Sequence, residues 1–266
     1  MRAENLPHEG TYICREDGVT NSMQELIQSY PRVRPELPAS IAEHYDQEYH
    51  DQLSRKRLAW SASKRVEEWM HRKVRDGSRG GSVLELGAGP LNHLVFEEPD
   101  GAYDIVEPRD FLYRDSPELS KVRDCYRDLT DVPTDRNYDR VISVAVLEHI
   151  PDLPQCLAKC GTLLKSGGIL QAGIPEEGGF LWGAGWRMTT GLSFKLRTGC
   201  SYGLVMRHEH LSEAPEIEKL VGFFFEDVRV CRFPFALHHL SLYGYIEARR
   251  PRLERCREYA LFGSEA

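Results

Sequence analysis

The sequence has no long hydrophobic run and no excess of positive charge. None of its 266 residues belongs to an apolar stretch approaching the roughly 20 residues of a bilayer-spanning helix, and the opening MRAENLPHEG lacks the apolar core of a secretory signal. Lysine and arginine number 34 against 41 aspartates and glutamates, a net charge of −7. A protein that binds nucleic acid along its whole length is expected to be basic. We therefore expect a cytoplasmic protein, and the sequence argues against a nucleic-acid partner and against membrane contact.

The cysteines also lack the pattern of a disulfide framework or a zinc site. The seven cysteines are odd in number, irregularly spaced, and include no CxxC pair. That pattern fits reduced thiols better than a disulfide framework or a zinc site. Cys156 and Cys160, four residues apart on an expected helix, are best explained as small buried hydrophobic residues. We expect no metal.

The chain is long enough for one large domain, or for a domain with an appendage. Its pattern changes at the glycine-rich stretch 76–81, which we expect to be a linker. We divide the chain into an irregular segment 1–38, an N-terminal helical lid 39–76, a main domain 82–250 and a C-terminal tail 251–266. Within the main domain, residues 175–211 do not fit the surrounding pattern and are expected to form a cap insertion.

After the linker, apolar strands alternate with helical or irregular stretches, which predicts an α/β fold with a parallel sheet. The expected strands are 82–86, 103–106, 125–127, 141–146 and 169–174, with a helix over 153–164. A helix at 212–221 precedes two further strands, 223–231 and 240–248. Their short connection suits an antiparallel pair at the sheet edge.

A strand followed by a glycine turn is the most informative motif. Gly87 and Gly89 follow the strand that contains Glu85. Glycine at these positions allows unusual backbone angles and lets a ligand approach the main chain. Pro90 suits the first turn of a helix, whose free N–H groups favour a carboxylate or phosphate.

Two acidic residues follow the next two strands. Glu107 stands twenty residues after Gly87, where a carboxylate can accept hydrogen bonds from both hydroxyls of a ribose. Asp128 follows the third strand and could accept from the exocyclic amine of adenine. The fourth strand opens into Glu148 and His149, and a helix–turn–strand unit spans 164–170.

These five elements, in this order and spacing, resemble a class I S-adenosylmethionine-dependent methyltransferase of the small-molecule type. The resemblance covers roughly residues 82–174 well and the terminal strand pair more loosely. It implies a Rossmann-like, mostly parallel seven-stranded sheet with an antiparallel edge pair, helices on both faces, and S-adenosyl-L-methionine as cofactor. The site residues that it implies are Gly87 and Gly89 at the methionine part, Glu107 at the ribose, Asp128 with the Leu129 backbone at adenine, Ala145 near the sulfonium, and Glu85 organising the turn. One departure is Leu91, where many members have a third glycine; it puts the shape of the loop in question.

Two other functions compete with this one. A nicotinamide-dependent dehydrogenase with a GxGxxG turn would need glycine where Asn92 stands, and Glu85 fits the methyltransferase pattern better. The chain could also be a non-catalytic module that binds an adenosyl ligand.

The expected cap has an unusual charge balance. From residue 178 to 208 there is no aspartate or glutamate, whereas Arg187, Lys195, Arg197 and Arg207 are present. Beside aromatic side chains, these groups could bind an anionic acceptor such as a phosphate, a carboxylate or a nucleotide-sugar. A solvated cationic face explains the same composition, and an interfacial membrane patch is a further alternative. The cap also resembles those of bacterial methyltransferases that modify sugars or surface polysaccharides.

A base is useful when the accepting hydroxyl or ammonium must lose a proton. His149, His208 and His210 are the candidates, and His208 and His210 would point the same way on an extended strand. His149 is equally well explained as a residue that supports its loop. Tyr45, one helical turn before Tyr49, could face the acceptor or pack on the sheet. The acceptor's identity, the choice of oxygen or nitrogen, and the oligomeric state are left open.

Overall fold

The structure is a computed structural model that describes residues 11–13, 21–39, 41–42 and 62–261. Within these ranges, eight strands form one sheet in the order β1-β7-β8-β6-β5-β2-β3-β4. The strands are β1 (Thr11–Ile13), β2 (Val83–Leu86), β3 (Tyr103–Val106), β4 (Asp124–Tyr126), β5 (Tyr138–Val144), β6 (Leu164–Pro175), β7 (Phe225–Phe233) and β8 (Tyr243–Pro251). The helices are α1 (Asn21–Gln28), α3 (Ala62–Asp76), α4 (Leu153–Leu163), α5 (Phe180–Trp186), α6 (Leu192–Thr198), α7 (Tyr202–Glu209), α8 (Ala214–Phe224) and α9 (Leu253–Leu261).

The seven strands expected from the sequence are present in the expected sense. Strands β4, β3, β2, β5 and β6 are parallel neighbours, and β8 and β7 extend the sheet antiparallel to them. An eighth strand, β1, pairs antiparallel with the outer edge of β7. Residues 1–38 were expected to be irregular, which is wrong for β1 and α1. The reason is that a three-residue strand exists only through its pairing with β7, and α1 packs on α8 with Met23 as its buried residue.

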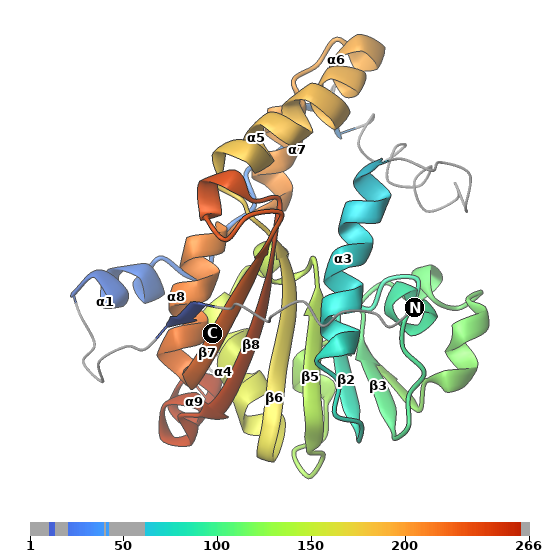
Figure 1. Ribbon diagram of the computed structural model, residues 1–266, viewed down its shortest axis with the longest axis vertical. Coiled ribbons are helices and arrows are strands. Elements are labelled where there is room, and N and C mark those ends of the chain that lie inside the picture. The colour runs from blue at the N-terminus through green and yellow to red at the C-terminus, as the bar shows by residue number, and fades with distance from the viewer. Residues whose placement is uncertain (1–10, 14–20, 40, 43–61, 262–266) are drawn as a thin grey trace, which may run out of the picture.

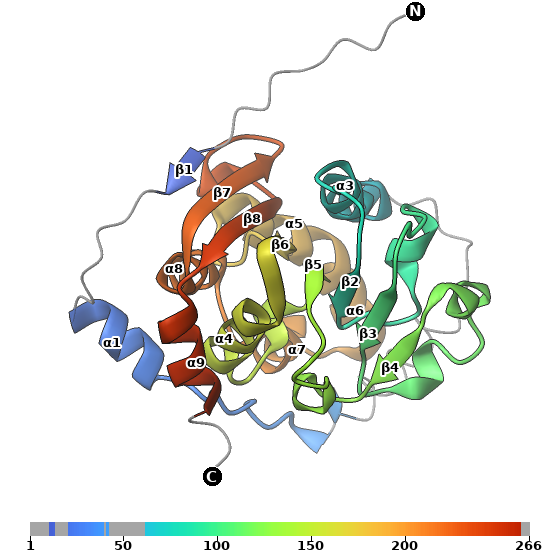
Figure 2. The ribbon, with the colours of Figure 1, turned by 90° about the horizontal axis from the view of Figure 1, so that it is seen from below.

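Helices cover both faces of the sheet, as expected. Helix α3 crosses one face, and α4, α8 and α9 lie on the other (Figures 1 and 2). On the α3 face, Met70 and Val74 are fully buried, and a Cβ added to Gly173 of β6 would lie 2.7 Å from the Cβ of Met70. On the opposite face, the fully buried thiol of Cys256 on α9 packs against Gly161 of α4. The glycines thus allow each helix to approach its neighbour closely.

The connections near the glycine turn are shorter than the sequence suggests. The chain after Gly89 forms only a four-residue 3-10 turn, η1 (Asn92–Val95), rather than the expected α-helix. Leu91, at its start, has a left-handed backbone with φ of 65°, which prevents a regular right-handed α-helix from starting there. Strands β3 and β4 are likewise joined through 3-10 turns. The C-terminal tail, in contrast, contains a true helix, α9.

The insertion after β6 forms a cap of three helices, α5 to α7. Figure 1 shows it rising above the sheet at the end where β2, β3 and β5 finish, the carboxyl edge of the parallel strands. Helices α5 and α6 are joined through a π-helical turn, η6 (Arg187–Gly191). The cap has a small core of its own, in which buried Phe194 and Val205 pack with Ile41. Within the described residues, no helix combines the length and apolar character that a bilayer crossing requires.

Candidate active site

Three neighbouring parallel strands end in register at one edge of the sheet. Leu86 pairs with Val106, and Val106 pairs with Tyr126. The register continues past the strands, because Gly87 N donates to Val106 O at 2.8 Å and Glu107 N donates to Tyr126 O at 2.8 Å. The glycine turn, Glu107 and the segment that holds Asp128 therefore lie side by side, as the spacing predicted.

The two glycines of the turn are required for different reasons. Gly87 has φ of 62°, and a Cβ there would lie 2.4 Å from Cγ2 of Val146. Gly89 has φ of 51°, but among the described residues no atom comes within 4 Å of a Cβ built on it. Gly87 therefore accommodates the loop after β5, whereas Gly89 leaves the main chain open on its outer side.

Glu107 links the turn to the end of β3. Its carboxylate is buried, with the residue 6 % exposed, and it accepts from Gly89 N at 2.9 Å and from Arg109 N at 3.0 Å. Each carboxylate oxygen can accept more than one hydrogen bond, so both oxygens keep capacity for hydroxyl donors. The glycine turn and the carboxylate thus form a single unit.

The other expected cofactor residues have different local roles. Asp128 caps the turn η4 (Leu129–Asp131), because its Oδ1 accepts from Thr130 N at 2.8 Å. Ala145 has a left-handed backbone with φ of 55°, and its N–H donates to Gly173 O at 2.8 Å. Glu85 is buried on the α3 face and accepts from Tyr103 Oη at 2.8 Å; burial raises the pKa of its carboxyl to about 6.

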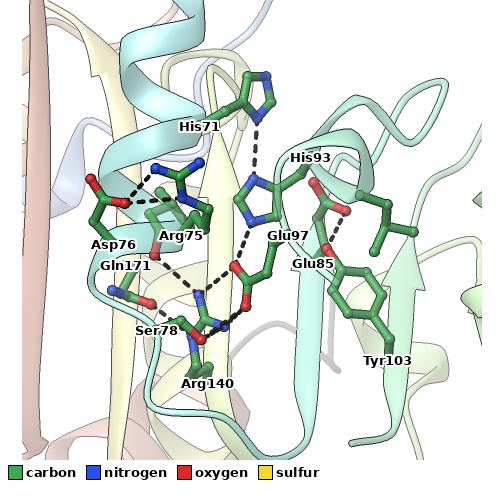
Figure 3. Close-up of polar contacts among 12 residues, drawn as sticks. His71, Arg75, Asp76, Ser78, Glu85, His93, Glu97, Tyr103, Arg140 and Gln171 are labelled. Carbon is green, nitrogen blue, oxygen red and sulfur yellow. Dashed lines mark hydrogen bonds and ion pairs between the residues drawn. The ribbon is translucent and has the colours of Figure 1, made fainter. Parts of the chain in front are cut away.

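A buried polar network beneath the turn fastens it to α3 (Figure 3). His93 of η1 contacts His71 of α3, Nδ1 to Nδ1 at 3.2 Å, and Glu97 through Nε2 at 3.0 Å. Glu97 in turn pairs with Arg140 of β5, which also donates to Gln171 at 2.8 Å. Burial lowers the pKa of His71 to about 3, so this ring is neutral, and one hydrogen bond joins the Nδ1 atoms of the two histidines. The network fixes the short turn where an α-helix was expected.

A second group of polar residues joins the carboxyl end of β5 to the cap. His149 Nδ1 lies 2.8 Å from Glu209 O, and its ring meets that of His210 edge-on at 4.9 Å between centroids. His210 Nδ1 lies 2.7 Å from Glu177 Oε2, an oxygen that also accepts from Trp182 Nε1 at 2.6 Å. Burial opposes protonation of His210, but the bond to Glu177 and the charge of Glu148 together raise its pKa.

The loop after β5 holds this group together through its backbone. Glu148 O accepts from Leu211 N at 2.7 Å and from Ser212 N at 3.2 Å, which fixes the end of the cap against the sheet. The side chain of Glu148 is buried, and its Oε2 has no hydrogen-bond partner among the described residues. Sequence reasoning missed Glu148 as a site residue, although its place after a buried strand was a usable signal. Glu177 was missed because its partner His210 lies 33 positions away.

The remaining candidates for the acceptor site divide into two groups. Arg187 and Arg207 line a cavity of about 770 Å³ between the cap and α8, together with His210 and Glu177. Arg197 is not among its lining residues and donates to Ser193 O within its own helix. Tyr45 lies outside the described residues.

The expectation that His208 and His210 point the same way needs correction. His208 does not face His210, because His208 lies in α7 rather than on an extended strand, and its Nδ1 bonds Pro35 O at 2.7 Å. Of the three proposed base residues, the structure brings together His149 and His210 only.

Comparisons with known proteins agree with the fold. The family model for a methyltransferase domain matches residues 114–172. No curated protein sequence matches the chain. A Thermotoga maritima SAM-dependent methyltransferase, described as a possible histamine N-methyltransferase, aligns at TM-score 0.55 and 17% identity, over 78% of this chain and 97% of its own. The N-methyltransferase NodS of Bradyrhizobium japonicum, solved with S-adenosylhomocysteine, aligns at TM-score 0.54 and 13% identity, over 77% and 98%.

At these identities the solved structures establish the fold, and the family match adds the methyltransferase domain. The family match favours a methyltransferase over a dehydrogenase. The matched segment runs from before β4 into β6, so it includes Asp128, Ala145 and the Glu148–His149 pair. In its fold and in the segment that the family model matches, this chain is similar to class I S-adenosylmethionine-dependent methyltransferases.

Proposed function

We propose that the enzyme moves a methyl group from S-adenosylmethionine to an oxygen or nitrogen of a small, polar, anionic acceptor bound beneath the cap. The observation that carries the proposal is that one short segment contacts both the glycine turn and the cap. Residues 145–149 touch the glycine turn through Val146 and the cap through His149. A donor at the first site and an acceptor at the second would lie on either side of this segment.

The carboxyl edge fits the cofactor. Gly89 leaves open main chain beside the buried carboxylate of Glu107, an arrangement suited to an adenosyl ligand with a free ribose diol. When bound, S-adenosylmethionine supplies a methyl on a sulfonium that departs as a neutral thioether. The residues we assign to it are Gly87, Gly89 and Glu85 around the methionine part, Glu107 at the ribose, Asp128 and the Leu129 backbone at adenine, and Ala145 near the sulfur.

The chain's contribution to the transfer is alignment and proton removal. Holding two reactants in line can lower a barrier by about 7–11 kcal/mol in favourable cases. We assign proton removal from the acceptor to His149 or His210, the two histidines that meet between the sheet and the cap. The bond to Glu177 raises the pKa of His210, which favours its taking up a proton.

The cavity supports an acceptor with a phosphate or carboxylate. Its volume of about 770 Å³ is within the usual range for small-molecule sites. Arg187 and Arg207 stand in its lining beside the carboxylates of Glu177, Glu213 and Glu216, the last of which is paired with Arg32. Guanidinium groups bind such anions through paired hydrogen bonds. A sugar phosphate or nucleotide-sugar has the required size and charge.

Release of S-adenosylhomocysteine, measured across pools of phosphorylated and carboxylated metabolites, tests the proposal. With an active acceptor in hand, Arg187→Ala and Arg207→Ala should each raise its KM about tenfold or more while leaving S-adenosylhomocysteine affinity unchanged. Arg197→Ala is the matched control, because it removes the same charge from the same cap outside the cavity. Equal KM values in all three variants would mean that Arg187 and Arg207 do not bind the acceptor and belong to a solvated cationic surface.

A further inference from the structure

Three side chains at the junction of sheet and cap carry groups that bind metals. Glu148, His149 and His210 each offer one ligand atom, and these atoms lie within 4.8 Å of one another. Two ligands on opposite sides of an ion with bonds of 2.0–2.1 Å lie about 4 Å apart. Small side-chain rotations would therefore bring all three onto one ion.

The hydrogen bonds of the two histidines leave the right nitrogens available. His149 Nδ1 faces a backbone carbonyl, Glu209 O, which can only accept, so this nitrogen carries the proton. His210 Nδ1 faces the carboxylate of Glu177, which makes it a donor as well. In a neutral imidazole the other nitrogen, Nε2, then holds a lone pair. Histidines that bind metals almost always donate their second N–H to a carbonyl or carboxylate in this way.

The carboxylate of Glu148 provides the second, independent observation. Its side chain is 2 % exposed, Oε2 has no hydrogen-bond partner among the described residues, and Oε1 lies 3.7 Å from Nε2 of His149. A buried charge without a partner is costly. The backbone N–H groups of Leu211 and Ser212 go to its carbonyl instead, so they do not relieve the carboxylate. A positive ion bound at this point would stabilise the buried carboxylate.

We propose that Glu148, His149 and His210 bind one divalent first-row transition-metal ion. Two imidazoles and one carboxylate suit zinc, cobalt or iron better than magnesium, which prefers oxygen ligands throughout. Three protein ligands leave coordination positions open toward the cavity that His210 lines. The binding itself depends only on these side chains, and that the open positions receive an acceptor oxygen rests on the proposed function. With an ion bound, the lone pairs of both histidines are engaged, so the proton-removing role proposed above belongs to the metal-free protein.

Cobalt(II) is the probe for this site, because its visible absorption reports the ligand type. Protein stripped with a chelator and kept reduced should bind one cobalt ion per chain with a spectrum of nitrogen and oxygen ligands. Glu148→Gln and His210→Gln should each weaken binding at least 100-fold. Removing the acceptor for His210 with Glu177→Ala should weaken it about 10- to 100-fold. His208→Gln is the matched control, since this histidine lies two positions from His210 but bonds Pro35 O.

Far-UV circular dichroism of the metal-free variants verifies that each has folded. A thiolate charge-transfer band, no stoichiometric binding, or the same affinity in wild type and Glu148→Gln would overturn the proposal. Separate titration with S-adenosylhomocysteine keeps the two hypotheses apart. Cofactor binding and acceptor turnover without cobalt binding would refute the metal site alone, whereas cobalt binding without cofactor binding would refute the proposed function alone.

Discussion

Replacing Glu107 by alanine should weaken the binding of S-adenosylhomocysteine about 100-fold or more. The carboxylate is buried and accepts from Gly89 N and Arg109 N, so its loss removes both the proposed ribose partner and the link that holds the glycine turn. A hydrogen bond to a charged group contributes about 1.5–3 kcal/mol. Two bonds to the ribose therefore amount to at least about 3 kcal/mol, which is about two factors of ten in Kd.

Isothermal titration of wild type, Glu107→Ala and Glu107→Gln with S-adenosylhomocysteine measures this effect. The glutamine variant should lie between the others, because its amide keeps one acceptor oxygen but sets an NH₂ group against a backbone donor. Glu118→Ala, which removes a carboxylate paired with Lys121 on the surface, serves as the control. An affinity for Glu107→Ala within threefold of wild type, with the fold intact, would refute the ribose assignment.

Three other predictions follow from the same region. Gly87→Ala should destabilise the fold by about 1–3 kcal/mol, because its Cβ meets Val146 in a left-handed backbone, whereas Gly89→Ala should mainly weaken S-adenosylhomocysteine binding; chemical denaturation and titration separate the two. Burial raises the pKa of Glu85 in the folded state to about 6, so protonation of this carboxyl stabilises the fold at low pH, and that stabilisation is lost as the pH rises from about 4.5 through 6. Glu85→Gln should therefore be about 2 kcal/mol more stable than wild type at pH 8. Equal unfolding curves of the two proteins at pH 8 would contradict this. S-adenosylhomocysteine should raise the melting temperature and NADH should not; the reverse would favour the dehydrogenase.

The parallel half of the fold could be predicted because its signals are local. Each buried strand appears as an apolar run, and the glycine turn and Glu107 follow strands directly, so sequence position alone places them at one edge. Even there, the nature of a connection was not predictable. Leu91 in a left-handed conformation and the buried network around His93 replace the expected helix with a short turn. That network joins residues up to 100 positions apart in the sequence, from His71 to Gln171.

The acceptor side was less predictable because its contacts are long-range. The composition of the cap identified four cations but could not show which of them face a cavity; Arg187 and Arg207 do, while Arg197 does not. The spacing of His208 and His210 suggested a shared direction, but the end of α7 falls between them and turns them apart. The expectation of no metal rested on the number and spacing of the cysteines, whereas Glu148 and His149 meet His210 only through the fold.

The segment 145–149 connects the proposed donor and acceptor sites through one stretch of backbone. Val146 packs against Gly87, so the position of the glycine turn constrains the segment from one side. The carbonyl of Glu148 holds Leu211 at the end of the cap, which constrains it from the other. A displacement of the cap is therefore transmitted through a few covalent bonds to the turn that we assign to the cofactor. Because the two sites share this backbone, substitutions at Val146 should change the KM of the acceptor and the affinity for S-adenosylhomocysteine together, while substitutions at Arg187 should change only the first.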